Sequence, residues 1–245
     1  MKRYSKKHTL KVYEVNCFGD LKLLSLFNIL QEAACEHADI LGIGYQSCVK
    51  AGVAWVAASY RVDINHLPKL GQDFIIETWV ADLNAVTSQR CYRIKNDQGR
   101  ILIEGITNWA LISSETLRPV AISKNLPIDL NQIDGEKLKF SSDKIRLMPP
   151  EKTDFHSHFL SRFDEMDTNF HINNAIYPTW AAETLPPQWQ ETKAPTCIQI
   201  NFKMPTKAFE QIDVISQICE FKTLHKISVA DQTKALVQIN WQNKN

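Results

Sequence analysis

The sequence repeats one pattern of secondary structure. In each half, a strand-like run precedes a helical stretch, and consecutive strand-like runs joined by short turns follow. The helices are expected from Leu23 to about Leu41 and from about Ala175 to Leu185. The strands are expected at 8–15, 54–63, 73–81, 86–94 and 101–112, and again at 156–163, 196–203, 212–221, 226–230 and 235–241. An internal repeat of this length indicates two copies of a domain rather than a solenoid.

The first helix limits how each copy can pack. Apolar residues such as Leu24, Phe27 and Leu30 cover well over one face, which is typical of a buried helix. A buried helix followed by consecutive strands predicts an α+β fold in which a helix packs against an antiparallel sheet. We expect an N-terminal domain at 1–122 and a C-terminal domain at 153–245. Turn-forming and charged residues dominate 123–152, which predicts a linker that runs over the surface.

A dense polar segment, Asp167–Asn174, lies between the first strand and the helix of the second half. Such side chains must be hydrated, paired or functional, because burying them unpaired costs several kcal/mol. Pro178 is tolerated in a first helical turn, so this helix is expected to begin near Asn174–Ile176 with Asn173 or Asn174 as its N-cap. The segment is therefore placed beside the free backbone N–H groups of a helix start.

The polar residues Asp167, Asn169 and His171 have no evident counterpart in the first half. At an offset of 147 or 148 residues, Asp167 and His171 fall on Asp20 and Leu24 or on the residues just before them. A requirement of the fold alone should apply to both copies. This comparison predicts that the second copy carries chemistry and that the first supplies structure or an acyl-chain wall.

The segment Arg162–Tyr177, followed by Trp180 and Glu183, resembles the acyl-acyl-carrier-protein thioesterases of plants and bacteria. The hallmark of that family is an aspartate, then Asn-x-His, a branched apolar residue, Asn-Asn, an aromatic residue and a tryptophan. The resemblance continues in order through Leu30–Ala34, Val53–Val56, Leu70–Gln72, Glu77–Trp79, Trp109 and Glu115–Pro119. It covers nearly the whole chain. It implies two tandem hotdog domains, each a long helix wrapped by an antiparallel sheet, with the catalytic motif in the second and an acyl-chain wall in the first.

The resemblance implies that Asp167, Asn169 and His171 are the catalytic residues. Thioester hydrolysis needs an activated water, a polarised carbonyl and a dry slot for the acyl chain. Asp167 is the expected base, which deprotonates or orients the water, while Asn169 and His171 position the water or the carbonyl. Backbone N–H groups at the helix start are expected to stabilise the oxyanion. The structural alternative is that the three residues only form a cap and turn network.

The family also places an acidic residue on the strand that follows the second helix. Here that strand reads Ile200–Lys207, and Pro205 occupies the expected position of the glutamate. The second carboxylate is missing unless Glu210 reaches the site. Since proline donates no backbone hydrogen bond, the strand at Pro205 is expected at a sheet edge or in a bulge.

The resulting function is hydrolysis of fatty acyl-acyl-carrier-protein thioesters, which releases free fatty acid. Two alternatives stay open: hydrolysis of acyl-coenzyme A by the same fold, and a non-catalytic module that binds acyl groups or the carrier protein. A hotdog dehydratase fits the Asn-Asn helix start less well. The expected partner is an acyl carrier protein, and a homodimer is left open.

Composition excludes several other classes of protein. The formal net charge is +1, which does not favour nucleic-acid binding. Five cations in the first eleven residues indicate a solvated terminus or an arm that attracts an acidic partner such as a carrier protein: Lys2, Arg3, Lys6, Lys7 and Lys11. No run approaches the roughly 18 apolar residues of a membrane span. The six scattered cysteines, without a C-x-x-C pair, predict reduced thiols in a cytoplasmic protein.

No cofactor or metal is expected. His156 and His158 alternate on a strand and share a face, so together with Asp164, Asp167 and His171 they imitate a metal site. Paired surface histidines are a commoner arrangement, and the resembling family requires no metal.

Overall fold

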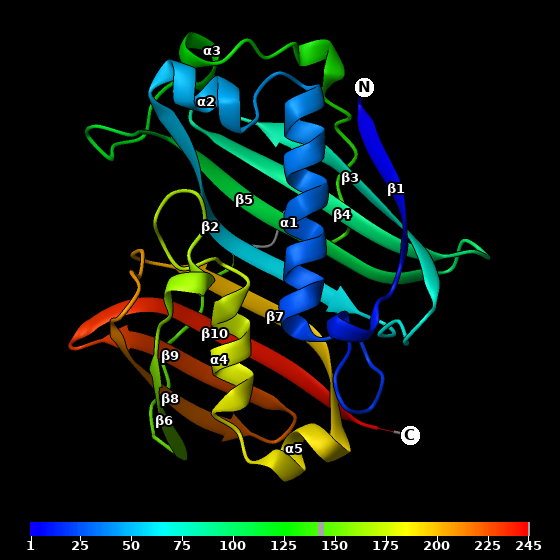
Figure 1. Cartoon of the computed structure of the whole chain (residues 1–245), viewed down its shortest axis with the longest axis vertical. Helices are drawn as coiled ribbons and strands as arrows, with labels where there is room; N and C mark the ends of the chain where they lie inside the picture. The colour runs from blue at the N-terminus through cyan, green and yellow to red at the C-terminus, as the bar shows by residue number, and fades with distance from the viewer. Residues whose placement is uncertain (142–144, 245) are drawn as a thin grey trace. The chain divides into compact units, whose positions relative to one another are not determined.

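The computed structural model describes residues 1–141 and 145–244, and the chain divides into two compact units (Figure 1). Unit 1 comprises Met1–Tyr60 and Asn65–Asp143, and unit 2 comprises Arg61–Ile64 and Lys144–Asn245. Each unit contains antiparallel strands and a helix that packs on them, so the predicted α+β class is confirmed. Within the described residues, no helix has the length and apolar character that a membrane crossing requires.

The strands of unit 1 are ordered β1-β3-β4-β5-β2. Their bounds are β1 (Arg3–Thr9), β2 (Val53–Ile64), β3 (Asp73–Leu83), β4 (Thr87–Asn96) and β5 (Ile101–Ser113). The β4–β5 hairpin closes at the turn expected from the sequence, where the Asn96 Oδ1 accepts hydrogen bonds from the backbone N–H groups of Gln98 and Arg100. Gly99 completes this turn at a φ of 77°, a conformation that glycine adopts without a steric penalty.

The helices of unit 1 are η1 (Val12–Glu14), α1 (Leu23–Ile40), α2 (Tyr45–Ala51), α3 (Ile122–Asn125) and η2 (Leu130–Gln132). Helix α1 packs against β1 and β3 and has the extent that the sequence predicts (Figure 1). Phe27 and Leu30 are buried, whereas Asn28 and Glu32 are exposed. The expected buried helix is therefore buried on one side only, because these polar residues, four positions apart, form an exposed stripe.

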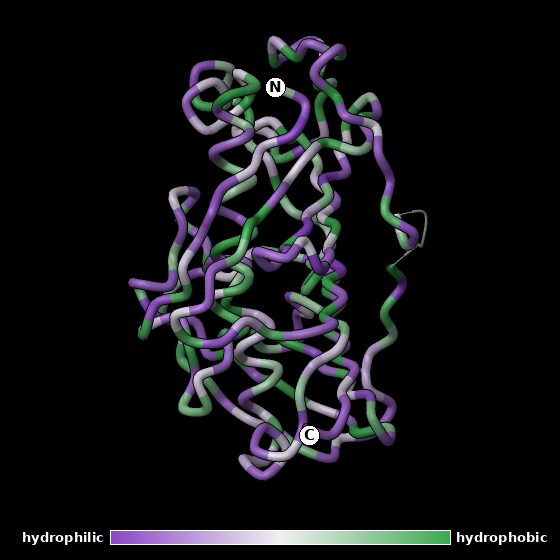
Figure 2. The backbone as a smooth tube through the Cα atoms, turned by 90° about the vertical axis from the view of Figure 1, so that its right-hand side faces the viewer, coloured by the Kyte–Doolittle hydropathy of each residue, from purple (hydrophilic) through white to green (hydrophobic). Residues whose placement is uncertain are grey.

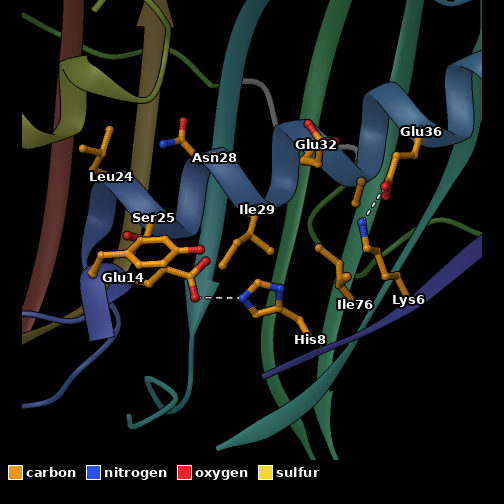
Figure 3. Close-up of a pocket in the computed structure, with 12 residues that line it drawn as sticks. Lys6, His8, Glu14, Leu24, Ser25, Asn28, Ile29, Glu32, Glu36 and Ile76 are labelled. Atoms are coloured by element: carbon orange, nitrogen blue, oxygen red, sulfur yellow. Dashed lines mark hydrogen bonds and ion pairs between the residues drawn. The ribbon is translucent and has the colours of Figure 1, made fainter. Parts of the chain in front are cut away.

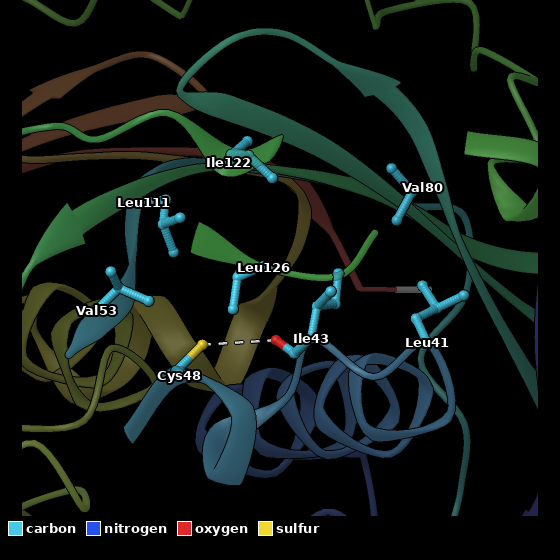
Figure 4. Close-up of a cluster of buried hydrophobic side chains, with 8 residues drawn as sticks. All are labelled: Leu41, Ile43, Cys48, Val53, Val80, Leu111, Ile122 and Leu126. Carbon is cyan, nitrogen blue, oxygen red and sulfur yellow. Dashed lines mark hydrogen bonds between the residues drawn. The ribbon is translucent and has the colours of Figure 1, made fainter. Parts of the chain in front are cut away.

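Part of the expected linker belongs to the core of unit 1. Ile122 and Leu126 pack in a buried cluster with Leu41, Ile43, Cys48, Val53, Val80 and Leu111 (Figure 4). Further along, Leu138 and Phe140 are also buried. The backbone of this stretch is held as well, since the Trp79 indole N–H donates to the Glu136 carbonyl oxygen at 2.8 Å. Burial of these apolar side chains corrects the expectation that the stretch runs over the surface.

The strands of unit 2 are ordered β7-β10-β9-β8-β6. Their bounds are β6 (Phe155–Leu160), β7 (Lys193–Phe202), β8 (Gln211–Cys219), β9 (Lys222–Val229) and β10 (Gln232–Asn243). Strands β8 and β9 bury every second side chain over most of their length. Hydrophilic and hydrophobic segments likewise alternate along much of the chain (Figure 2). A period of two is what a sheet with one covered face requires.

The helices of unit 2 are η3 (Phe163–Glu165), α4 (Ile176–Glu183) and α5 (Pro187–Thr192). Helix α4 packs against β8, β9 and β10 and is 8 residues long, compared with 18 for α1. It begins where Pro178 predicts, but the N-cap is Ala175 rather than an asparagine. The Asn173 side chain instead binds the N-cap residue itself, since its Oδ1 accepts the N–H of Ala175 at 3.0 Å.

Candidate active site

The three candidate residues lie on one tight turn between η3 and α4. Asp167 organises this turn, because its Oδ1 accepts the backbone N–H of Asn169 at 2.8 Å and that of His171 at 3.4 Å. The Asp167 N–H donates in return to the His171 carbonyl oxygen at 2.7 Å. Met166 and Ile172 pair across the base of the turn. The structure therefore brings Asp167, Asn169 and His171 together, and it gives Asp167 a structural role that the other two lack.

The same turn occurs in unit 1. There the Asn16 Oδ1 accepts the N–H groups of Phe18 at 2.9 Å and Asp20 at 3.0 Å, and the Asn16 N–H donates to the Asp20 carbonyl oxygen at 2.8 Å. The two copies thus correspond at an offset of 151 residues, from Asn16 to Asp167 and from Asp20 to His171.

This register corrects the offset of 147 or 148 used in the sequence comparison. Asn169 lies over Phe18 and His171 over Asp20, so the turn has a counterpart in the first copy although its amide and imidazole do not. Glu14 and Glu165 coincide at this offset and could have revealed the register from the sequence.

The side chains of Asn169 and His171 are available for a ligand. Over residues 1–141 and 145–244, neither the Asn169 amide nor the His171 imidazole has a hydrogen-bond partner. Asn169 is exposed and His171 is half-buried. The backbone of this turn is held by Asp167 while these two functional groups remain unengaged. Such an arrangement can orient a water molecule or a carbonyl oxygen with little reorganisation.

The corresponding turns differ in how they are closed. In unit 1, the Leu70 N–H donates to the Gly19 carbonyl oxygen at 2.9 Å, and Lys69 forms an ion pair with Asp20. In unit 2 the turn of Asp167 is linked to the connection between β7 and β8 by one backbone hydrogen bond, from the Ile172 N–H to the Thr206 carbonyl oxygen at 2.8 Å. No ion pair covers His171 in the described part of the chain. His171 thus replaces an ion-paired aspartate.

The backbone donors at the helix start are largely used by the protein itself. The N–H groups of Ala175 and Ile176 donate to Oδ1 and to the carbonyl oxygen of Asn173, both at 3.0 Å. The Asn173 N–H donates to the Glu165 carbonyl oxygen at 2.8 Å. In the segment 173–176, the Asn174 N–H is left without an acceptor among the described residues. Of the backbone donors in this segment that were expected to stabilise the oxyanion, only the Asn174 N–H therefore remains free.

A buried contact that the sequence did not suggest anchors the turn to α4. The Tyr177 hydroxyl and the Thr206 Oγ1 are 3.0 Å apart, and both residues are buried. Burial raises the pKa of Tyr177 to about 12, so the phenol stays neutral and can donate this hydrogen bond. Thr206 thus links α4 to the turn through its side chain and its carbonyl oxygen.

The segment around Pro205 differs from the expectation. Strand β7 ends at Phe202, and Pro205 is an exposed residue of the connection to β8. The expected strand edge or bulge at Pro205 is therefore wrong. The Pro205 carbonyl oxygen accepts a hydrogen bond from the buried Lys234 Nζ at 3.1 Å.

The Glu210 carboxylate contributes one of its oxygens to a turn of the backbone. Its Oε2 accepts the Lys207 N–H at 2.9 Å, which closes the local turn. In unit 1 the Gln72 Oε1 makes the equivalent bond to the Lys69 N–H at 3.0 Å. An uncharged side chain performs the same task there, so the Glu210 contact is structural.

A cavity of about 420 Å³ lies in unit 1, against α1, β1 and β3 (Figure 3). None of the three candidate residues lines it. The lining mixes Leu24, Ile29 and Ile76 with ionisable groups, among which His8 and Glu14 are 2.9 Å apart. Because an apolar chain gains little against charged groups, this lining does not suit an acyl tail.

The basic N-terminal segment is paired within unit 1. Arg3 binds Asp134 at 3.0 Å, Lys7 binds Asp73 at 2.6 Å, and Lys6 binds Glu36. These acids neutralise most of the charge that the arm interpretation requires, so an acidic partner gains little by contacting this segment.

The histidine pair has a different partner from the expected ones. His156 and His158 both face Asp213 on β8, with nitrogen-to-oxygen distances of 3.3 and 2.7 Å. Their ligand atoms lie within 4.8 Å of one another, while Asp164, Asp167 and His171 are not part of the group. The absence of a metal stays a prediction from the sequence.

Comparison with known families identifies the family to which this chain belongs. The family described as "Acyl-ACP thioesterase N-terminal domain" matches residues 1–128, and "Acyl-ACP thioesterase C-terminal domain" matches residues 149–243. The chain belongs to the acyl-acyl-carrier-protein thioesterase family. The family recognised from the motif in unit 2 is therefore confirmed.

Known members of the family are distant relatives. The chain is 24% identical to the chloroplastic palmitoyl-acyl carrier protein thioesterase of Cuphea hookeriana over 82% of its own length and 51% of that protein. It is 22% identical to the chloroplastic oleoyl-acyl carrier protein thioesterase 1 of Arabidopsis thaliana over 88% of its own length and 63% of that protein. It thus spans between half and two thirds of the length of these relatives.

Solved structures of the family share the fold over nearly the whole chain. A putative oleoyl thioesterase from Lactobacillus plantarum has a TM-score of 0.86 at 24% identity and covers 99% of this chain, as this chain covers 97% of it. The 12:0-ACP thioesterase from Umbellularia californica has a TM-score of 0.83 at 18% identity, with coverage of 100% and 98%. The hotdog fold implied by the motif is confirmed.

Proposed function

We propose that this acyl-acyl-carrier-protein thioesterase family member hydrolyses fatty acyl thioesters of acyl carrier protein and releases free fatty acid. Family membership supports this reaction class. The observation that carries the proposal is the turn in unit 2, where the amide of Asn169 and the imidazole of His171 are unengaged while Asp167 holds their backbone. The equivalent turn in unit 1 lacks both groups, so unit 1 is proposed as the non-catalytic copy.

In the proposed reaction, a water oxygen attacks the thioester carbonyl carbon and the carbon–sulfur bond breaks. Asp167 takes or orients the water proton through Oδ2, because Oδ1 is engaged by the turn. Asn169 and His171 position the water or polarise the carbonyl, and the Asn174 N–H is the nearby backbone donor for the oxyanion. The thiolate of the carrier's phosphopantetheine arm leaves and is protonated.

Release of free thiol from acyl-carrier-protein and acyl-coenzyme A substrates tests the proposal. Asn169→Ala and His171→Ala should each lower hydrolysis by at least about a hundredfold. Neither change removes a side-chain hydrogen bond inside the protein, so both variants should melt like the parent. The matched control is Asp20→Asn at the position in unit 1 that corresponds to His171, which should retain activity. Near-parent turnover in both site variants contradicts the assignment.

A second function has its own support. Pro205 stands in a loop where the resembling family has a glutamate, and one oxygen of Glu210 is engaged in closing a turn. This favours a non-catalytic module that binds acyl groups or the carrier protein, and binding without thiol release from any substrate would establish it. Release from acyl-coenzyme A alone would instead identify an acyl-coenzyme A thioesterase.

We extend the proposal to domain boundaries and location. The C-terminal hotdog domain is placed at 153–245, and the N-terminal one at 1–122 together with the following stretch up to Phe140 that is buried in unit 1, which limited proteolysis can test. A cytoplasmic location is supported by six free cysteines, two of which, Cys17 and Cys35, are exposed.

A further inference from the structure

Two turns of unit 2 carry phenylalanine in a backbone conformation that favours glycine. Phe170 has a φ of 60° and Phe209 a φ of 65°. At the corresponding positions of unit 1 the residues are Gly19 and Gly71, each with a φ of 75°. A bulky side chain at positive φ is strained, whereas glycine adopts this conformation freely. Unit 1 shows that both turns form without phenylalanine at the position of positive φ.

Stability of the fold does not explain these two phenylalanines. Phe170 is 77% exposed and Phe209 is 70% exposed, so neither ring contributes much to a core. Backbone strain retained by a structure is concentrated at functional sites and ligand clamps. An exposed ring at a strained position beside a candidate site is therefore a candidate for contact with a molecule outside the chain.

The two rings belong to one region of unit 2. The Phe209 N–H donates to the Ser161 carbonyl oxygen at 2.8 Å, and the Ile172 N–H donates to that of Thr206 at 2.8 Å. These bonds join the turn of Phe209 to the turn of the candidate site. The same joined segments expose Phe163 and Met204, and we call the four side chains Phe163, Phe170, Met204 and Phe209 the phenylalanine surface.

In the described part of the chain, two cations without a partner lie beside this surface. Lys203 and Lys207 are exposed on the connection that bears Met204, and neither ammonium group has a partner among the described residues. The carboxylates nearby keep their charge but have partners of their own, since Glu210 accepts the Lys207 backbone N–H and Arg162 pairs with Glu165 and Asp164. Exposed rings flanked by unpaired lysines are complementary to an acidic protein that has an apolar contact face.

We infer that the phenylalanine surface docks the acyl carrier protein, with Lys203 and Lys207 facing its acidic side chains. The inference rests on the proposed function, since Phe170 lies between Asn169 and His171 on the same turn. A carrier held there presents its acyl-phosphopantetheine arm beside the candidate catalytic groups. Docking thereby accounts for the phenylalanines in unit 2 and the glycines in unit 1.

The test compares oleoyl-acyl carrier protein with oleoyl-coenzyme A, which has the same arm and no carrier protein. Phe170→Asn and Phe209→Asn, alone and combined, remove the rings, and asparagine tolerates positive φ. In the double variant, the ratio of kcat/KM for the carrier substrate to that for the coenzyme A substrate should fall by about tenfold or more, a loss typical of interface hot spots. Lys203→Glu with Lys207→Glu should lower the same ratio, with a smaller effect at high salt.

Leu117→Asn is the matched control. Leu117 is an exposed apolar residue of unit 1 with a φ of 57°, and it lies outside the phenylalanine surface. This variant should leave the ratio unchanged. The phenylalanine variants should melt no lower than the parent, because the strain is relieved, and this result separates lost docking from lost folding.

Three outcomes overturn the inference. One is an unchanged ratio in the double variant, and another is an equal loss on both substrates, which places the rings at the shared arm. The third is binding of the parent to phosphatidylglycerol vesicles that the double variant loses, which assigns the surface to a membrane. If the parent releases no thiol from oleoyl-acyl carrier protein, the proposed function fails separately. Titration with the unloaded carrier protein then still tests docking, and weaker binding by the double variant supports it.

Discussion

The turn that holds the candidate residues makes a sharp prediction about Asp167. This carboxylate has two separable tasks, since Oδ1 accepts two backbone N–H groups and Oδ2 is the proposed site of proton chemistry. Unit 1 separates them naturally, because Asn16 builds the same turn with an amide oxygen at 2.9 and 3.0 Å. Asp167→Asn should therefore keep the turn and remove the base, whereas Asp167→Ala should remove both.

The expected magnitudes follow from these bonds. Asp167→Ala leaves two N–H groups without their acceptor in a half-buried turn, which costs about 1–3 kcal/mol of the free energy of unfolding. Asp167→Asn keeps the acceptor and loses only the contribution of the charge, at most about 1 kcal/mol. Hydrolysis by Asp167→Asn should nevertheless fall by at least about a hundredfold, the contribution of a general base.

Urea denaturation and thiol release, measured on the same preparations, check both parts. Asn16→Ala and Asn16→Asp serve as controls in unit 1, where the first should destabilise and neither should abolish hydrolysis. Near-parent turnover in a folded Asp167→Asn variant would refute the role of Asp167 as base. Equal stability of Asp167→Ala and Asp167→Asn would refute the structural role derived from the turn.

Two further predictions concern stability. Burial lowers the pKa of His225 to about 3, so the folded protein keeps this imidazole neutral while the unfolded chain binds a proton below about pH 6.5. Stability is then fully present above pH 6.5 and is lost as the pH falls towards 3, by about 2 kcal/mol between pH 6.5 and 5. Urea denaturation at both pH values should show this loss of unfolding free energy in the parent and a smaller loss in His225→Gln. An equal loss in the two proteins would contradict the role of His225. Leu126→Ala should cost roughly 2–4 kcal/mol by leaving a cavity in the unit 1 cluster, whereas the exposed Leu130→Ala should cost little, and a melt that fails to distinguish them would contradict the placement of this stretch in the core.

Local features of the structure could be predicted from the sequence. The extent of α1, the start of α4 at Pro178 and the turn at Asn96–Gly99 follow from periodicity and from the φ preferences of proline and glycine. The α+β class follows from the order of helix and strands in each half. Asp167, Asn169 and His171 are candidates because they lie within five residues of one another and match the family motif. Signals of this kind depend on neighbouring residues alone.

The register of the two copies depended on tertiary structure. The turns at Asn16 and Asp167 are each anchored to a distant segment, at the carbonyl oxygens of Pro68 and Thr206. Backbone hydrogen bonds of this kind leave no residue pattern, because any residue except proline can donate them. The structural role of Asp167 therefore appeared only in the folded chain, although the coincidence of Glu14 and Glu165 marks the same offset of 151 residues in the sequence.

The surroundings of the site were also decided by the fold. The sequence identifies Phe170 and Phe209 as ordinary apolar residues, which usually indicate a core. Only the folded backbone places them at positive φ with their rings exposed, at positions where the other copy has Gly19 and Gly71. The local sequence determined which chemical groups this protein has. Hydrogen bonds between distant segments decided which of those groups hold the turn and which remain free to meet a substrate.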